Sequence, residues 1–145
     1  MTNDTRLLAG SRQWLTMVGE QLQKAAQRAG LPSDLTVSLV ERYSDGDEIA
    51  PGLVQGLRFD IRCGAPSYRI GAYPEEKGDI TVEVTSEAAR RLNQLISTDP
   101  AYAHAVKEYL KSGALRIDGD PAELGAWFGS VHDDIVRRTE LNVLN

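Results

Sequence analysis

The sequence predicts an α+β fold in which a five-stranded, mostly antiparallel sheet is covered by helices. Residues 6–29 repeat their apolar side chains with the period of a helix. Four segments between residues 35 and 85 instead alternate apolar and polar residues, as half-buried strands do. Helical spacing then returns and encloses one further short strand, 114–118. A chain of 145 residues, 41% hydrophobic and 26% charged, is expected to form a single domain over 1–145, with its core in 35–138.

The first element is expected to be an amphipathic helix over residues 6–29. Its charged side chains lie largely on one side and its apolar side chains on the other, which favours packing across a sheet. Gly30 and Pro32 follow, and both residue types are typical of a helix end. The apolar positions are Leu8, Leu15, Val18, Leu22, Ala25, Ala26 and Ala29.

Four strands are expected next, because each segment has one apolar and one polar face. Such alternation is typical of an antiparallel sheet with one face in water. The segments are LTVSLVERY (35–43), LRFDIRC (57–63), SYRIGAY (67–73) and DITVEVT (79–85).

The connections between these strands predict hairpins. CGAPS (63–67) and PEEKGD (74–79) are short and rich in turn-forming residues. The longer SDGDEIAPG (44–52) is expected to be a hairpin end or a loop at an entrance. Arg58, Arg62 and Arg69 fall on the polar faces of the strands, where Asp60 and Glu83 are suitable partners. The alternative function for these arginines is to anchor an acidic head group.

After Thr85 the pattern changes to that of helices. Ser86 is expected to cap one helix, and Asp99-Pro100 opens another. Because helices separate strand 114–118 from the fourth strand, we expect it to run parallel to a neighbour. A final helix is expected to start at Asp120. Its apolar face consists of Leu124, Trp127, Phe128, Val131 and Ile135.

Composition argues against several functional classes. The net charge is −5 and no basic stripe is present, so nucleic acid is not an expected partner. No segment approaches the roughly 20 apolar residues of a membrane span, and the first residues do not resemble a signal peptide, so a cytoplasmic location is expected. Cys63 is the only cysteine. It is in phase with Phe59 and Ile61, so we expect a small buried side chain.

The order of elements over residues 53–138 resembles the sterol carrier protein type two family of lipid-binding domains. The residues that carry this resemblance are Asp79, Ile80, Val82 and Val84 in the fourth strand, and Gly113, Leu115, Ile117, Gly119 and Asp120 around the fifth. The resemblance implies a sandwich of five strands and helices with an apolar cavity for fatty acyl chains, acyl-CoA or sterols. It implies no catalytic residues and no cofactor. The stretch 97–113 is longer than in a minimal member, and the end of the last helix is more polar.

A hydrophobic small molecule is therefore the expected ligand, bound between the sheet and the helices. No catalytic residue, metal ligand or cofactor is expected. The residues expected to line the cavity are Phe59, Ile61, Tyr68, Ile70, Leu92, Leu95, Leu115, Ile117, Trp127, Phe128 and Val131.

Two other functional classes are compatible with the sequence. One is a small enzyme of the isomerase or hydratase type, with His104 or His132 and a carboxylate as general base. The other is a module without a pocket that forms homodimers. The cluster that could suggest acid–base or metal chemistry consists of His132, Asp133 and Asp134. Adjacent helical residues point about 100° apart, which favours an exposed helix face over a metal site.

Overall fold

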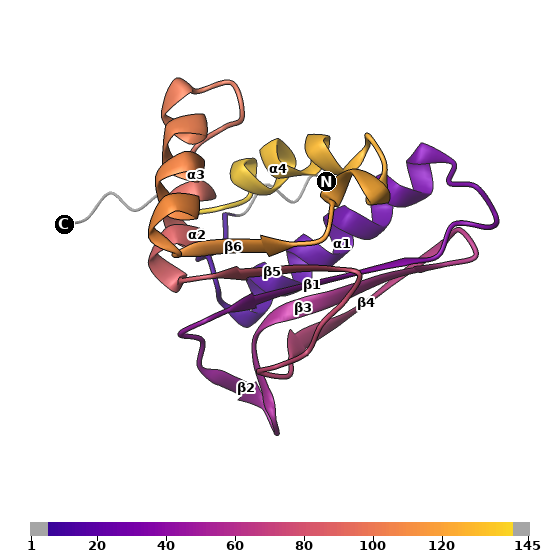
Figure 1. Cartoon of the computed structure of the whole chain (residues 1–145), viewed down its shortest axis with the longest axis horizontal. Helices are drawn as coiled ribbons and strands as arrows, with labels where there is room; N and C mark the ends of the chain where they lie inside the picture. Colours follow the sequence, from indigo (N-terminus) through magenta and orange to yellow (C-terminus); the bar gives the residue numbers. More distant parts are fainter. Residues whose placement is uncertain (1–5, 141–145) are drawn as a thin grey trace.

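A six-stranded sheet forms the centre of the fold, and the helices lie on one side of it (Figure 1). The computed structural model describes residues 6–140. The strand order is β2-β3-β1-β5-β6, and β4 also pairs with β3. The strands are β1 (Val37–Tyr43), β2 (Glu48–Ala50), β3 (Leu53–Arg62), β4 (Ala65–Ala72), β5 (Ile80–Val84) and β6 (Leu115–Asp118).

The expected α+β class and the mainly antiparallel pairing are confirmed, whereas the expected number of strands is wrong. The additional strand is β2, which lies inside the segment 44–52 and pairs with Leu53 and Val54 of β3. A strand of three residues is too short to give a periodic signal in the sequence.

The expected direction of the last strand is also wrong. β6 is antiparallel to β5, and the parallel pair is β1 with β5. Val84 at the end of β5 pairs with Leu115 at the start of β6. The intervening helices therefore return the chain to the end of the sheet that it left, so the next strand must run backwards.

The segment 74–79 is not a hairpin. It connects β4, which pairs with β3, to β5, which pairs with β1, and so it passes across the sheet. Ion pairs fix this segment against the sheet, because Glu76 pairs with Arg58 at 3.0 Å and also with Arg69. Arg42, only 8% exposed, donates to the backbone carbonyl of Glu76 and pairs with Glu83 at 3.2 Å.

This charged side of the sheet agrees in part with the sequence. Arg58 also pairs with Asp60 at 3.1 Å, as expected for a polar face with its own partners. Glu83 accepts from Arg116 as well as Arg42. Arg62, by contrast, is exposed at the end of β3. Arg58 and Arg69 therefore lie among carboxylates.

The helices are α1 (Arg12–Ala29), α2 (Ser86–Leu92), α3 (Pro100–Ser112) and α4 (Phe128–Arg137). The first helix begins later than residue 6, because Gly10 has a positive φ of 86° and Ser11 then caps the helix by accepting from the Trp14 amide. Leu8 lies outside α1 and is 60% exposed. The helix ends at Gly30 in the left-handed conformation, as predicted.

Two further helix starts differ from expectation. Thr85, and not Ser86, caps α2, while the Ser86 hydroxyl donates to Asp45. The last helical segment is broken, because a 3-10 turn (Pro121–Leu124) ends at Gly125 and α4 begins only at Phe128. The expectation of Asp99 as the cap of α3 is confirmed.

Cys63 is exposed, which corrects the expectation of a buried side chain. Arg62 pairs with Ala65, so Cys63 and Gly64 form the two-residue turn between β3 and β4. Both have positive φ, 50° and 78°, as this type of hairpin turn requires. The alternation of β3 therefore stops one residue before Cys63.

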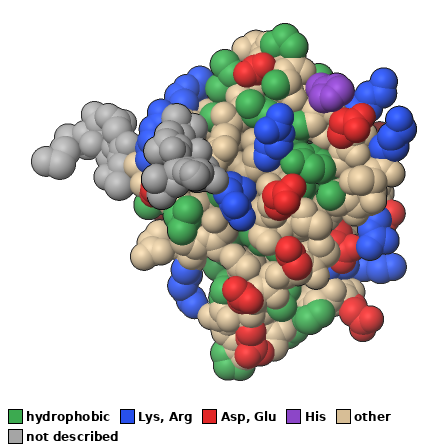
Figure 2. Space-filling view, turned by 90° about the vertical axis from the view of Figure 1, so that its left-hand side faces the viewer, with side chains coloured by type: hydrophobic (Ala, Val, Ile, Leu, Met, Phe, Trp, Pro, Cys, Tyr) green, Lys and Arg blue, Asp and Glu red, His purple; other side chains and the backbone are tan. Residues whose placement is uncertain are grey.

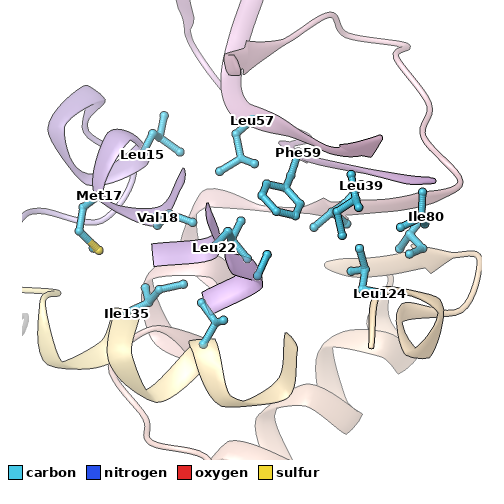
Figure 3. Close-up of a cluster of buried hydrophobic side chains, with 14 of the residues drawn as sticks. Leu15, Met17, Val18, Leu22, Leu39, Leu57, Phe59, Ile80, Leu124 and Ile135 are labelled. Atoms are coloured by element: carbon cyan, nitrogen blue, oxygen red, sulfur yellow. The ribbon is translucent and has the colours of Figure 1, made fainter. Parts of the chain in front are cut away.

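The main core lies between the sheet and the helices α1 and α4 (Figure 3). Leu39 of β1 and Phe59 of β3 lie near Leu22 of α1, and Ile80 of β5 lies beside Leu124. A second cluster joins α2 and α3 to the ends of β1, β5 and β6. No helix within residues 6–140 is long and apolar enough to cross a membrane.

A buried hydrogen bond connects the start of α1 to the end of α4. The Trp14 indole Nε1 donates to the Thr139 hydroxyl at 2.9 Å, and that hydroxyl donates to the Ile135 carbonyl at 2.7 Å. The two helices are therefore joined at one end by polar contacts as well as by packing.

Replacing Gly56 with Ala is expected to destabilise the fold by about 1–3 kcal/mol. A Cβ at Gly56 would lie 2.3 Å from the backbone carbonyl oxygen of Glu41, and the φ of 153° disfavours a side chain. Gly129→Ala in α4 is the control, since no heavy atom lies within 4 Å of the added Cβ, and it is expected to stabilise by up to about 1 kcal/mol. Chemical denaturation measures both, and a Gly56→Ala protein as stable as the wild type would contradict the packing of β1 on β3.

Candidate ligand-binding cavity

A cavity of about 310 Å³ lies between the helical side of the sheet and the helices. This is at the small end of the ~300–1,000 Å³ range of ligand pockets. The apolar lining residues are Trp14, Leu15, Val18, Leu22, Leu57, Val82, Val84, Ala89, Leu92, Val106, Leu115, Ile117, Pro121, Phe128, Val131 and Ile135.

The cavity lies where the two hydrophobic clusters meet. Leu15 and Leu57 belong to the cluster of α1 and α4, whereas Val84 and Leu115 belong to that of α2 and α3. Val82 packs against both clusters. Ala89 places only a methyl group in the space between them. The cavity therefore lies where two pairs of helices pack on one sheet and leave the space between them unfilled.

The end of the molecule that carries α2 and α3 has a mixed surface. Figure 2 shows acidic and basic side chains interspersed there with separate apolar patches. No extended patch of one sign is visible on this face.

Glu41 is the acidic residue in the cavity lining. It lies on the same side of β1 as Leu39 and Tyr43, because side chains two residues apart share a face of a strand. Burial raises the pKa of Glu41 to about 6. Glu41 is half-buried and lines the cavity, so a molecule in the cavity can contact it.

Two tyrosines lie near this carboxylate. Tyr43 has a buried hydroxyl without a hydrogen-bond partner in residues 6–140. Burial, and next the charge of Glu41, raise the pKa of Tyr43 above its ordinary value. Burial and the charge of Glu41 also raise the pKa of Tyr102, which lines the cavity from α3.

His132 lines the cavity from α4, whereas His104 is exposed on α3. The His132 ring packs on Tyr102, with ring centroids 4.4 Å apart. Its Nε2 is 2.8 Å from the Leu95 carbonyl oxygen. Because a carbonyl only accepts, this contact requires the hydrogen on Nε2 and leaves Nδ1 for other contacts.

The neighbours of His132 point elsewhere, as the helical spacing predicts. Asp133 accepts from the backbone amide and the hydroxyl of Ser97, both at 2.7 Å, and these bonds lower its pKa. Asp134 pairs with Arg137. Among residues 6–140, no group of three or more His, Cys, Asp or Glu side chains is arranged to hold a metal ion.

The structure places the residues expected to line the cavity in two groups. Those found in the lining are Leu92, Leu115, Ile117, Phe128 and Val131. The others lie outside it: Phe59 and Ile61 are fully buried in the main core, Tyr68, Ile70 and Trp127 pack against that core, and Leu95 is half-buried after α2.

Sequence reasoning missed the contributions of α1 and β1 to the lining. For α1, nothing in the pattern separates Leu15 or Val18 at the cavity from their neighbours in the core. For Glu41 a signal exists, since a charged residue stands on the apolar face of a strand between Leu39 and Tyr43. Such a break in the alternation is typical of a functional position.

Replacing Glu41 with Gln is expected to change the pH dependence of stability. Because the folded pKa of about 6 exceeds the ordinary 4.5, folding favours the protonated carboxyl. This contribution is fully present below about pH 4.5 and is lost as pH rises through 6. The unfolding free energy of Glu41→Gln relative to the wild type is expected to increase by about 2 kcal/mol from pH 4 to pH 8. Denaturant unfolding across this range tests it, with Glu108→Gln, exposed on α3, as the control. A pH-independent difference for Glu41→Gln would contradict the burial of the carboxylate.

Comparison with known proteins identifies the fold. No family model and no curated protein sequence matches the chain. The crystal structure of sterol carrier protein 2 is 15% identical in sequence, with a TM-score of 0.50 over 91% of this chain and 99% of that one.

Two other solved structures are also similar. One is a conserved hypothetical protein of Thermus thermophilus, described as possibly a sterol carrier protein, with 14% identity and a TM-score of 0.48 over 98% of this chain and 99% of that one. The other is sterol carrier protein domain 2 of Helicoverpa armigera, with 14% identity and a TM-score of 0.45 over 90% and 91%. At 15% identity, the likeness to sterol carrier protein 2 concerns architecture only. The chain has the fold of sterol carrier protein 2, as its sequence pattern predicted.

Proposed function

We propose that the protein binds a hydrophobic small molecule in the cavity between the sheet and the helices. The observation that carries this proposal is a mainly apolar cavity at the junction of two core clusters in a fold like that of sterol carrier protein 2. Water gains few hydrogen bonds from such a lining, so an apolar ligand is the favoured occupant. Fatty acyl chains and sterols are the ligand classes that the family resemblance implies.

The size and rim of the cavity limit the ligand further. A volume of about 310 Å³ favours one compact apolar group or a single chain over a conjugate enclosed entirely with a nucleotide head group. Ile117 lines the cavity and is nevertheless 40% exposed. Phe128 and Val106 also line it and are half-buried. We infer that the ligand enters beside β6, between α3 and the start of α4.

Filling the cavity from α3 is expected to weaken ligand binding. In Val106→Trp the indole would occupy the space of the ligand, because Val106 lines the cavity. The affinity for the neutral fluorescent dye N-phenyl-1-naphthylamine should fall at least about tenfold, which corresponds to ~1.4 kcal/mol. Fluorescence titration measures it.

The matched control is Lys107→Trp, which adds the same group at the next, exposed position of α3. It should bind the dye as the wild type does. Circular dichroism and thermal unfolding establish that both variants are folded. Undiminished binding by folded Val106→Trp would contradict this cavity as the binding site.

A further inference from the structure

Glu41 lines the cavity, and its carboxylate has no counter-ion among the residues that the structure describes. Within residues 6–140 it forms no hydrogen bond or ion pair with another side chain, and burial is the cause of its altered pKa. An ionised carboxylate in apolar surroundings is costly unless it is paired and hydrogen-bonded. The polar residues that share the lining with Glu41 are Tyr43, Asn93, Tyr102 and His132.

The cations on the neighbouring strands face the other side of the sheet. Arg42 follows Glu41 in β1, and its guanidinium group is bound by Glu83 and by the backbone of Glu76. Arg58 of β3 is bound by Asp60 and Glu76. These two arginines are therefore bound on the other face of the sheet, by segment 74–79 and by Asp60 and Glu83. On the cavity face, Glu41 has no basic partner among the described residues.

We propose that the natural ligand is an apolar molecule that carries a basic amine, and that Glu41 binds the protonated amine inside the cavity. This inference rests on the proposed function, because it requires the cavity to hold a ligand. An ammonium group supplies both the positive charge and the hydrogen-bond donors that the carboxylate lacks. The aromatic rings of Tyr43 and Tyr102, both close enough to feel the charge of Glu41, add surfaces that attract a cation.

Other head groups satisfy the site less well. A fatty acid would bring a second carboxylate beside Glu41, and two such groups in one site disfavour each other's ionisation. An alcohol would donate one hydrogen bond and leave the negative charge uncompensated. The carboxylate therefore selects among molecules with equal apolar parts according to their polar end.

Binding of an amine is expected to depend on pH. Because the pKa of Glu41 is raised to about 6, the carboxylate is charged above that pH and becomes neutral below it, so the affinity for an amine should fall on acidification. His132 also lines the cavity, Arg90 and Asp45 act on the neighbouring Tyr43, and Asp133 acts on Tyr102. Glu41 is therefore assigned only that part of the pH dependence of amine binding that the wild type shows and Glu41→Gln lacks.

The test compares dodecylamine, dodecanoic acid and dodecanol, which share one apolar chain. Each displaces N-phenyl-1-naphthylamine from the protein at pH 7.5, below the concentration at which the ligands form micelles. The wild type is expected to bind the amine at least about tenfold more tightly than the acid or the alcohol, a difference of ~1.4 kcal/mol. Glu41→Gln should remove this preference while it still binds the neutral dye.

Glu108→Gln, which removes the same charge from the exposed surface of α3, should keep the preference. If the dye binds but the amine shows no preference in the wild type, the inference about the amine is wrong and the proposed function stands. A preference that survives in Glu41→Gln would also overturn it. If the dye does not bind the wild type at all, the proposed function itself fails.

Discussion

The structure depends on the packing of all its described helices on one face of a single sheet. Phe59, Leu39 and Ile80 present a dry surface to α1 and α4, while Val84 and Leu115 present another to α2 and α3. The two contacts are made by different pairs of helices, and the Trp14–Thr139 hydrogen bond joins only the first pair. The cavity lies at the junction between them, where Ala89 contributes only a methyl group. The cavity therefore exists because the core consists of two clusters that do not fill the space between them.

The opposite face of the sheet explains why the cavity contains an acid. That face is covered by the crossing segment 74–79, which Glu76 ties to Arg58 and Arg69. With Arg42 also engaged there, the strands offer the helical side a carboxylate but no partner for it. Elsewhere in the sheet the polar face and the apolar face are well separated. Glu41 is an exception, because this charged residue lies on the apolar face. The buried charge of Glu41 lowers the stability of the fold at neutral pH, and a ligand with the opposite charge would restore that stability.

Periodicity predicted much of this fold because it reports which face of each element is buried. The strands β1, β3, β4 and β5 follow from periodicity, whereas the end of α1 follows from Gly30, a residue type that is typical of a helix end. The direction of β6 was not, because it depends on where α2 and α3 return the chain. Phe59 and Val131 look alike in the sequence, yet one fills the core and the other lines the cavity. Cavity position depends on how helices diverge, which no single residue encodes. The expected cytoplasmic location and the possible homodimer stay predictions.

Native mass spectrometry tests the central claim, that the cavity binds an apolar small molecule, most directly. The protein would be purified without detergent, incubated with a cellular lipid extract, and measured under gentle and then energetic activation. The account predicts a complex of one chain with one small apolar molecule, which is released on activation and can be identified by its mass. A spectrum that contains only the unliganded chain under the gentlest conditions would contradict it.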